Sequence, residues 1–148
     1  MKIICVGKIK EKYLKEAIDD YSKRISKYTK LEILEVMDEA IKEKALKKEA
    51  EGILKHIKES DYVITLDING DILSSYDFAF KLDKIMINNS NIVFIIGGSY
   101  GLDDSVKKRS NYALSFSKMT FPHQLFRVML LEQIYRSYKI INNESYHK

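Results

Sequence analysis

The sequence has little of what marks disulfide-rich, membrane-spanning or secreted proteins. It contains one cysteine and one proline among 148 residues. Cys5 cannot form an intramolecular disulfide, and its position inside the first apolar run predicts a buried strand thiol, which fits a reducing cytosol. No apolar run approaches the roughly 18 residues of a membrane span, and the run at residues 1–7 is too short for a signal-peptide core. We therefore expect a cytoplasmic protein without membrane contact.

Long blocks of one charge sign are also missing. The 25 basic and 21 acidic residues give a net charge of +4, and lysine and glutamate are interspersed over residues 42–51, as on a solvated helix face. This mildly basic balance permits a polyanionic partner without requiring one. With 45% hydrophobic residues and no linker, repeat or low-complexity segment, the chain predicts a single globular domain over residues 1–148.

Strand and helix patterns alternate along the chain. Apolar or alternating runs predict strands at residues 2–6, 31–37, 62–66, 91–96 and 112–116. Apolar residues at helical spacing predict helices at residues 9–28, 39–59, 74–85, 102–109 and 123–141. The sequence Asp67-Ile-Asn-Gly70 is a turn signal that would end the third strand. This alternation predicts an α/β fold with a mostly parallel sheet.

Three glycines follow the fourth predicted strand, in the stretch Gly97-Gly98-Ser-Tyr-Gly101. The apolar run before them is typical of a central, fully buried strand. Glycines there permit positive φ and let the backbone approach a ligand closely, and ligands of open α/β sheets bind at the carboxyl edge. A plain strand-to-helix turn is the alternative interpretation.

The last predicted helix is apolar in nearly every direction, where a helix on one sheet needs a stripe of only about 100°. We interpret this as burial between two surfaces, the second being another subunit in a twofold homodimer. The alternative is a central helix covered by its own chain. The apolar residues are Leu125, Phe126, Val128, Met129, Leu130, Leu131, Ile134, Tyr135, Tyr138 and Ile141.

Five segments spread over the whole chain carry a family resemblance. They are residues 65–70, 96–102, 114–123, 132–136 and 143–148, and the last of them ends in Tyr146-His147-Lys148. Together, in order and at matching chain length, they resemble the RlmH family, which are SPOUT-superfamily methyltransferases of the large ribosomal subunit. Ser99-Tyr100 is a local departure at a place where family members vary, so no side-chain role is carried over to it.

The resemblance implies S-adenosylmethionine-dependent methylation at N3 of a pseudouridine in 23S rRNA, with assembled ribosomes as the substrate. It implies the SPOUT-type fold, a mostly parallel sheet flanked by helices with a C-terminal trefoil knot, although periodicity says nothing of a knot. It also implies a homodimer, in agreement with the apolar last helix, and a protein that needs no metal.

The resemblance further implies which residues bind the cofactor. All of them lie at or just after the carboxyl ends of predicted strands, so they can converge on one edge of the sheet. Pro122 fixes the backbone where the last helix begins. The implied cofactor residues are Leu66, Gly97, Gly98, Gly101, Phe116, Ser117, Lys118, Met119, Thr120 and Phe121.

The chemistry asks for a proton acceptor, because the pseudouridine N3–H must lose its proton before the nitrogen attacks the methyl group. Histidine suits this near neutral pH. His56 lies in a charged helix and is interpreted as a surface residue. His123 begins a helix, whose positive dipole end would favour the neutral imidazole, or it only orients the cofactor loop. The candidate catalytic or RNA-positioning residues are His123, Arg136, Tyr146, His147 and Lys148. A frayed chain end is the alternative for the last three.

Two other classes explain part of the pattern. A flavodoxin-like or Rossmann-like nucleotide enzyme would account for the alternation and the glycine turn, but not for the Pro122-His123 loop or the chain end. A non-catalytic ribosome-binding module would account for the basic charge, but leaves the glycine edge without a purpose.

Overall fold

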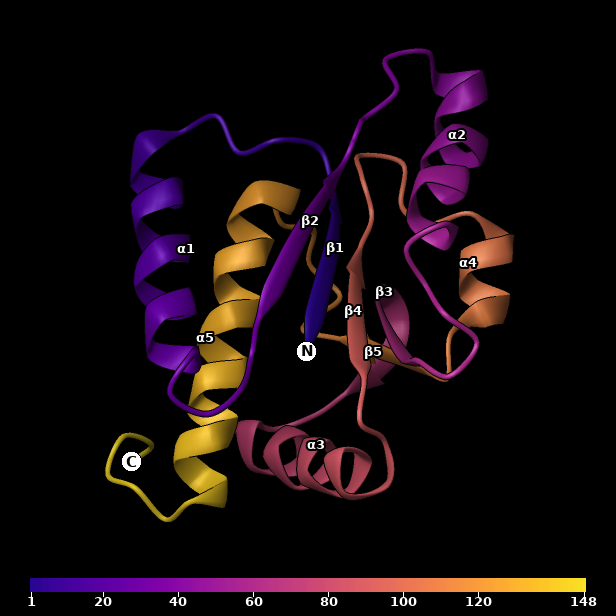
Figure 1. Cartoon of the computed structure of the whole chain (residues 1–148). Helices are drawn as coiled ribbons and strands as arrows, with labels where there is room; N and C mark the ends of the chain where they lie inside the picture. The colour runs from indigo at the N-terminus through magenta and orange to yellow at the C-terminus, as the bar shows by residue number, and fades with distance from the viewer.

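The computed structural model describes all 148 residues and contains five strands and five helices that alternate along the chain (Figure 1). In order they are β1 (Lys2–Val6), α1 (Lys12–Ile25), β2 (Glu32–Val36), α2 (Lys42–Leu54), β3 (Tyr62–Ile72), α3 (Ser75–Asn88), β4 (Ile92–Ile96), α4 (Asp104–Arg109), β5 (Tyr112–Ser115) and α5 (His123–Ile141). Every predicted element is present, and the bounds of α5 are those that the sequence predicted.

All strand pairs are parallel, and the strand order is β2-β1-β4-β3-β5. This confirms the predicted α/β class. A flavodoxin-like sheet has the order 2-1-3-4-5, so the exchange of the third and fourth strands separates this chain from that rival. The trefoil knot stays a prediction that comes from the resemblance.

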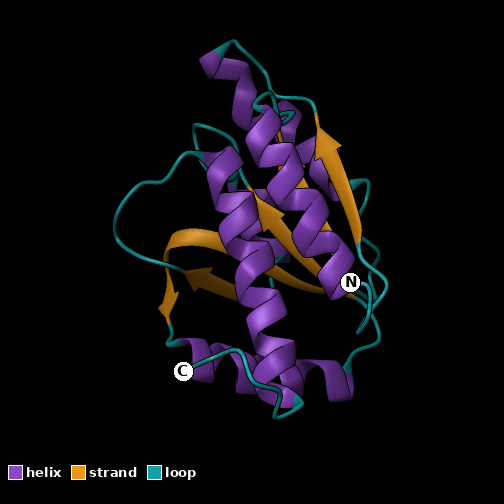
Figure 2. Ribbon diagram, turned by 90° about the vertical axis from the view of Figure 1, so that its left-hand side faces the viewer, coloured by secondary structure: helices purple, strands orange, loops and turns teal.

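The helices cover both faces of the sheet (Figures 1 and 2). One apolar core lies between the sheet and α1, α3 and α5, and a second, smaller core lies between the sheet and α2 and α4. All five residues of β4 are buried, as expected for an apolar strand in the middle of a parallel sheet. None of the helices has the combination of length and hydropathy that crossing a membrane would require.

The third strand is longer than the sequence predicted. β3 continues past Leu66 to Ile72, and its pairing with β5 shifts between Leu66 and Asp71, both of which face Leu114. The Asp67 carboxylate accepts a hydrogen bond from the Asn69 backbone N–H at 2.9 Å. The turn signal thus forms a bulge, after which the strand returns to the same neighbour, and the predicted end at this turn was wrong.

The apolar surface of α5 is covered mostly by its own chain. Its buried residues pack in the core that α1, α3 and the sheet share, so the alternative interpretation, a central helix covered by its own chain, accounts for them. On α5, Leu125 stays exposed and Met129 is half-buried. The homodimer therefore stays a prediction. The apolar residues of α5 alone do not require a second subunit, so other exposed apolar surfaces must support it.

Gly70 provides a test of the bulge. A Cβ at Gly70 would lie 2.6 Å from the carbonyl carbon of Ala113 in β5. We expect Gly70→Ala to destabilise the protein by about 1–3 kcal/mol, because the β5 backbone must shift. Asn69→Ala, at the exposed neighbouring position, should change stability by less than about 0.5 kcal/mol. Urea unfolding measures both, and equal stabilities of the two variants would contradict the close approach.

Candidate functional site

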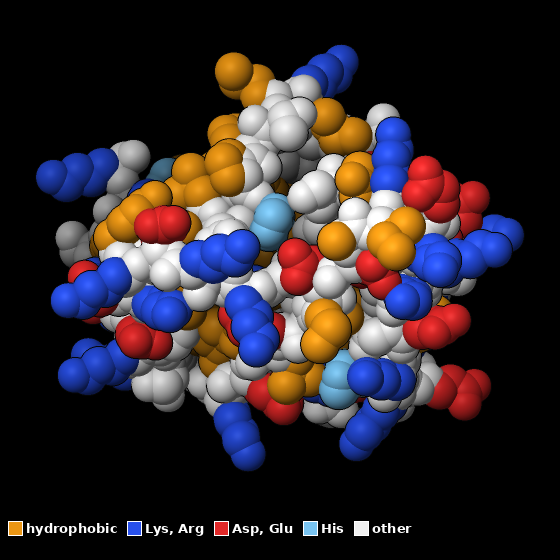
Figure 3. All heavy atoms as spheres, turned by 90° about the horizontal axis from the view of Figure 1, so that it is seen from above, with side chains coloured by type: hydrophobic (Ala, Val, Ile, Leu, Met, Phe, Trp, Pro, Cys, Tyr) orange, Lys and Arg blue, Asp and Glu red, His pale blue; other side chains and the backbone are white.

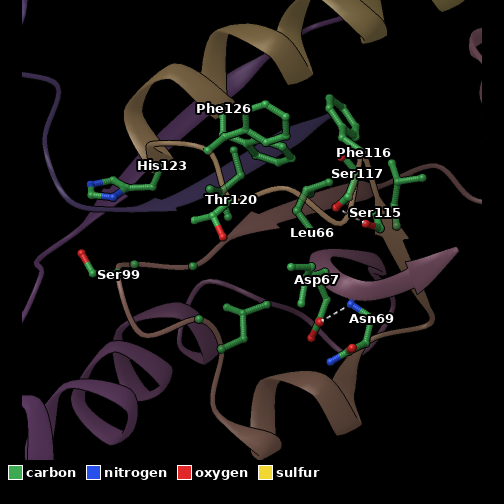
Figure 4. A pocket seen from close by; sticks show the side chains of 18 of the residues that line it. Leu66, Asp67, Asn69, Ser99, Ser115, Phe116, Ser117, Thr120, His123 and Phe126 are labelled. Carbon is green, nitrogen blue, oxygen red and sulfur yellow. Dashed lines mark hydrogen bonds between the residues drawn. The ribbon is translucent and has the colours of Figure 1, made fainter. Parts of the chain in front are cut away.

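A cavity of about 420 Å³ lies at the bulge of β3 and the carboxyl ends of β4 and β5. Figure 4 shows Leu66 and Asp67 of β3, Phe116 and Ser117 after β5, and His123 and Phe126 of α5 around one hollow. All the implied cofactor residues except Lys118 line it, namely Leu66, Gly97, Gly98, Gly101, Phe116, Ser117, Met119, Thr120 and Phe121. The sheet edge thus brings the predicted residues together.

The glycines after β4 form a tight turn. The Gly101 N–H donates to the Gly98 carbonyl at 3.1 Å, and Gly101 has a φ of +82°. A Cβ at Gly97 would lie 2.5 Å from the Gly101 carbonyl oxygen. The close approach that Gly97 permits is therefore within the turn itself. This differs from the expectation that its missing Cβ makes room for a ligand.

The segment between β5 and α5 is held by local contacts. The Ser115 hydroxyl donates to the Ser117 carbonyl at 3.0 Å, and the Ser117 hydroxyl accepts from the Met119 N–H at 3.0 Å. The ring centroid of Phe126 lies 4.8 Å from that of Phe116 and 6.0 Å from that of Phe121. The serine hydrogen bonds and the phenylalanine contacts together hold this segment in place as one wall of the cavity. The wall presents both backbone amide groups and aromatic side chains.

His123 lies at the junction of α5 with the end of β1. Its imidazole Nε2 is 3.3 Å from where a Cβ of Gly7 would stand, so the ring fits against a residue without a side chain. Burial lowers the pKa of His123, and the positive charge of Arg127 lowers it further. The sequence predicted a neutral imidazole from the helix dipole. The direction agrees, but the causes seen here are burial first and then the charge of Arg127.

Arg127 is a residue that the sequence analysis missed. It is 1% exposed on α5, donates from Nη1 to Glu35 at 2.7 Å and from Nη2 to the Gly7 carbonyl at 3.0 Å, and its Nε has no partner. A buried charge is tolerated when it is paired and hydrogen-bonded. The only signal in the sequence was an arginine one turn after His123, within the otherwise apolar stretch from Leu125 to Leu131.

The other catalytic candidates gather at the far end of α5. Glu132 accepts from Arg136 Nε at 3.0 Å and from the Tyr146 hydroxyl at 3.0 Å, and Arg136 Nη1 lies 2.9 Å from His147 Nδ1. The His147 ring meets the edge of Tyr76 at a centroid distance of 4.5 Å. Tyr146 and His147 therefore pack against α5 and α3 and are not a frayed end.

The surroundings of Arg136 and Tyr146 in this cluster at the chain end shift the pKa values of both side chains. The hydrogen bond to Glu132 raises the pKa of Arg136, and burial raises the pKa of Tyr146. Both groups keep their protons near neutral pH and present donors. Lys148 is exposed beyond them.

The two groups of candidates are far apart within one chain. His123 and Arg136 are separated by 13 residues of α5, which at 1.5 Å per residue is roughly 20 Å. Figure 1 shows the chain end beside the last turns of α5, at the opposite end from the carboxyl edge of the sheet. One subunit alone does not assemble the predicted catalytic set.

Comparisons with known proteins agree in both sequence and fold. A family model described as "Predicted SPOUT methyltransferase" matches residues 1–147. "Ribosomal RNA large subunit methyltransferase H" of Caldicellulosiruptor saccharolyticus is 55% identical over 153 residues, covering 100% of this chain and 99% of the relative. The protein of the same name in Clostridium botulinum strain Alaska E43 is 57% identical over 155 residues, covering 99% and 98%.

A solved structure of "a probable methylase family protein from Haemophilus influenzae Rd KW20" is similar with a TM-score of 0.56 at 13% identity. The match covers 99% of this chain and 70% of that one. At this identity the likeness concerns the fold alone.

The environment of His123 predicts its titration. Because burial and nearby positive charge disfavour the imidazolium, the ring should titrate below the ordinary histidine value of about 6.5, and the fold should lose stability as this proton binds at lower pH. NMR titration of the ring measures the midpoint. Lys10→Met removes one of the charges that lower the pKa and should raise the midpoint, whereas Lys15→Met on the exposed side of α1 should not. A wild-type midpoint at or above about 6.5 would show that burial and nearby positive charge do not lower the pKa of His123.

Proposed function

The chain belongs to the SPOUT methyltransferase family, among relatives named ribosomal RNA large subunit methyltransferase H, and from this premise we propose that it methylates N3 of a pseudouridine in 23S rRNA with S-adenosylmethionine as methyl donor. The observation that carries the proposal is the cavity at the bulge of β3 and the carboxyl ends of β4 and β5, which is lined by nine of the ten residues that the resemblance implies for the cofactor. The proposed substrate is the assembled ribosome in the cytoplasm.

The cavity has the properties that the cofactor requires. Its volume of about 420 Å³ lies in the range of small-molecule sites, and its lining combines apolar and polar groups. Leu66, Phe116 and Phe126 offer apolar surface to an adenine ring, while the backbone of the 116–121 loop offers donors and acceptors to its edge. The glycine turn lies across the cavity, next to the proposed place of the ribose and methionine.

S-adenosylmethionine supplies an activated methyl group on a sulfonium, so the protein must align the two reactants and exclude water. The N3–H gives its proton to a base, the N3 lone pair forms a bond to the methyl carbon, and the carbon–sulfur bond breaks, which leaves S-adenosylhomocysteine. His123 is the one histidine that lines the cavity, and its neutral form has a free lone pair. We propose it as an acceptor of the proton.

We further propose a homodimer in which the cluster of Arg136, Tyr146 and His147 from one subunit faces the cavity of the other. Two observations support this. The cluster is roughly 20 Å along α5 from His123, so in one chain it cannot reach the reacting atoms. Next to it, Tyr76 and Phe80 are 49% and 57% exposed on α3, which is apolar surface that a second copy would cover.

Removal of the gene provides the first test. Mass-spectrometric mapping of 23S rRNA from a deletion strain should show one pseudouridine without its methyl group, and purified protein with S-adenosylmethionine should restore it on isolated ribosomes. Binding of the cofactor is measured separately by calorimetry, with NAD, FMN and ATP as controls. Unchanged rRNA in the deletion strain, or a preference for one of the control nucleotides, would contradict the assignment.

The composite site is tested by mixing variants. His123→Gln and His147→Gln should each lower methyl transfer by about 10²–10⁴-fold, while His56→Gln, in the segment after α2, should leave it unchanged. Randomly mixed subunits of the two inactive variants should recover about a quarter of wild-type activity, because half of the dimers contain one intact site of two. Absence of recovery in dimers shown to have exchanged subunits would place both histidines in a site made by one chain.

A further inference from the structure

The segment that joins β1 to α1 presents two lysines without acidic partners. In residues 7–11, Lys8 and Lys10 are exposed, while Ile9 between them is 8% exposed and packs in the main core. Neither lysine takes part in a salt bridge, whereas Lys12 pairs with Glu16 at 3.7 Å. Two unpaired ammonium groups thus stand on one short stretch of chain.

The backbone on both sides of Lys8 is held by the ion pair of Arg127 and Glu35. Arg127 donates to the Gly7 carbonyl at 3.0 Å, and the Ile9 N–H donates to Glu35 Oε1 at 3.2 Å, the same oxygen that receives Arg127 Nη1. The Lys10 N–H in turn donates to the Gln124 side chain at 3.1 Å. An exposed segment is therefore fixed by three side chains from β2 and α5.

This fixed segment borders the candidate site. Gly7, which precedes Lys8, contacts the His123 ring, and Lys10 is close enough for its charge to lower the pKa of that imidazole. Figure 3 looks down on this edge of the molecule and shows a histidine near the middle of the face, with lysine or arginine side chains beside it and around the rim. Positive charge carried on an ordered backbone beside the candidate site suits a polyanion.

We propose that Lys8 and Lys10 bind phosphates of the RNA strand next to the target nucleotide and so position it over the cavity. The inference rests on the proposed function and names a contact surface for its substrate. Phosphate contacts set the register of a nucleic acid on a protein without reading sequence. Because the backbone beneath the lysines is already ordered, binding loses less conformational entropy than it would on a mobile loop.

The test measures ribosome binding and catalysis in Lys8→Ala/Lys10→Ala. For single-stranded RNA each phosphate contact contributes about 0.7 to the slope of log affinity against log salt, so the double variant should lose about 1.4 from the slope and roughly 20-fold in affinity at about 0.1 M salt. The KM for ribosomes should rise. At about pH 8, above the ordinary histidine pKa, kcat should stay nearly unchanged, because His123 is neutral there with or without the Lys10 charge.

The matched control is Lys30→Ala/Lys55→Ala, which removes the same charge from exposed positions before β2 and after α2, toward the amino ends of the strands. It should leave the salt slope unchanged. An equal loss of salt slope in both double variants would mean that only the net charge of the protein matters, which would overturn the proposal. An unchanged salt slope in Lys8→Ala/Lys10→Ala would overturn it too. A loss of S-adenosylmethionine affinity in that variant would instead assign the lysines to the cofactor. Failure of the wild type to bind S-adenosylmethionine at all would contradict the proposed function and not this surface.

Discussion

The ion pair between the buried Arg127 and the solvent-exposed Glu35 is the interaction on which the carboxyl edge of the sheet depends. A single guanidinium joins α5 to β2 and, through the Gly7 carbonyl, to the end of β1. It holds the first turn of α5 against the sheet and thereby places His123 beside Gly7. An apolar residue would fill the same volume, but it would leave the Gly7 carbonyl without this donor. The ion pair thus fixes the relative positions of α5, β1 and β2, whereas hydrophobic packing alone would add stability without fixing these positions.

One helix connects everything that we assign to function. The first turn of α5 contributes His123 and Phe126 to the cavity, its middle packs in the core with α1 and α3, and its second half, from Glu132 onward, carries the cluster with Arg136. Because the middle is buried, the two ends cannot move independently. The separation of cavity and cluster is therefore a fixed property of the subunit, and a second subunit is the simplest way to bring them together.

Much of this architecture could be predicted from local sequence, and particular residues show where prediction ended. The helix at 123–141 and the cap at Ser74, whose side chain accepts from the Asp77 N–H, follow from spacing and residue type. The pairing of Arg127 with Glu35 spans 92 residues of chain and leaves no local signal. The extension of β3 beyond Asp67 depends on its renewed pairing with β5 after the bulge, and this pairing between distant segments cannot be read from turn propensity. The distance between His123 and Arg136, by contrast, already followed from the predicted helix and its rise per residue.

The continuity of α5 also constrains how the sequence can change through evolution. Each residue added or removed within a helix rotates everything beyond it by about 100° and shifts it by about 1.5 Å. A single deletion between His123 and Glu132 would rotate the whole Glu132 cluster, Tyr146 and His147 included, relative to the cavity and would turn buried apolar residues of α5 out of the core. Insertions and deletions should thus accumulate in the connections between elements, such as the segment before α2, while the spacing from the cavity to the chain end stays invariant in length even where its residues differ.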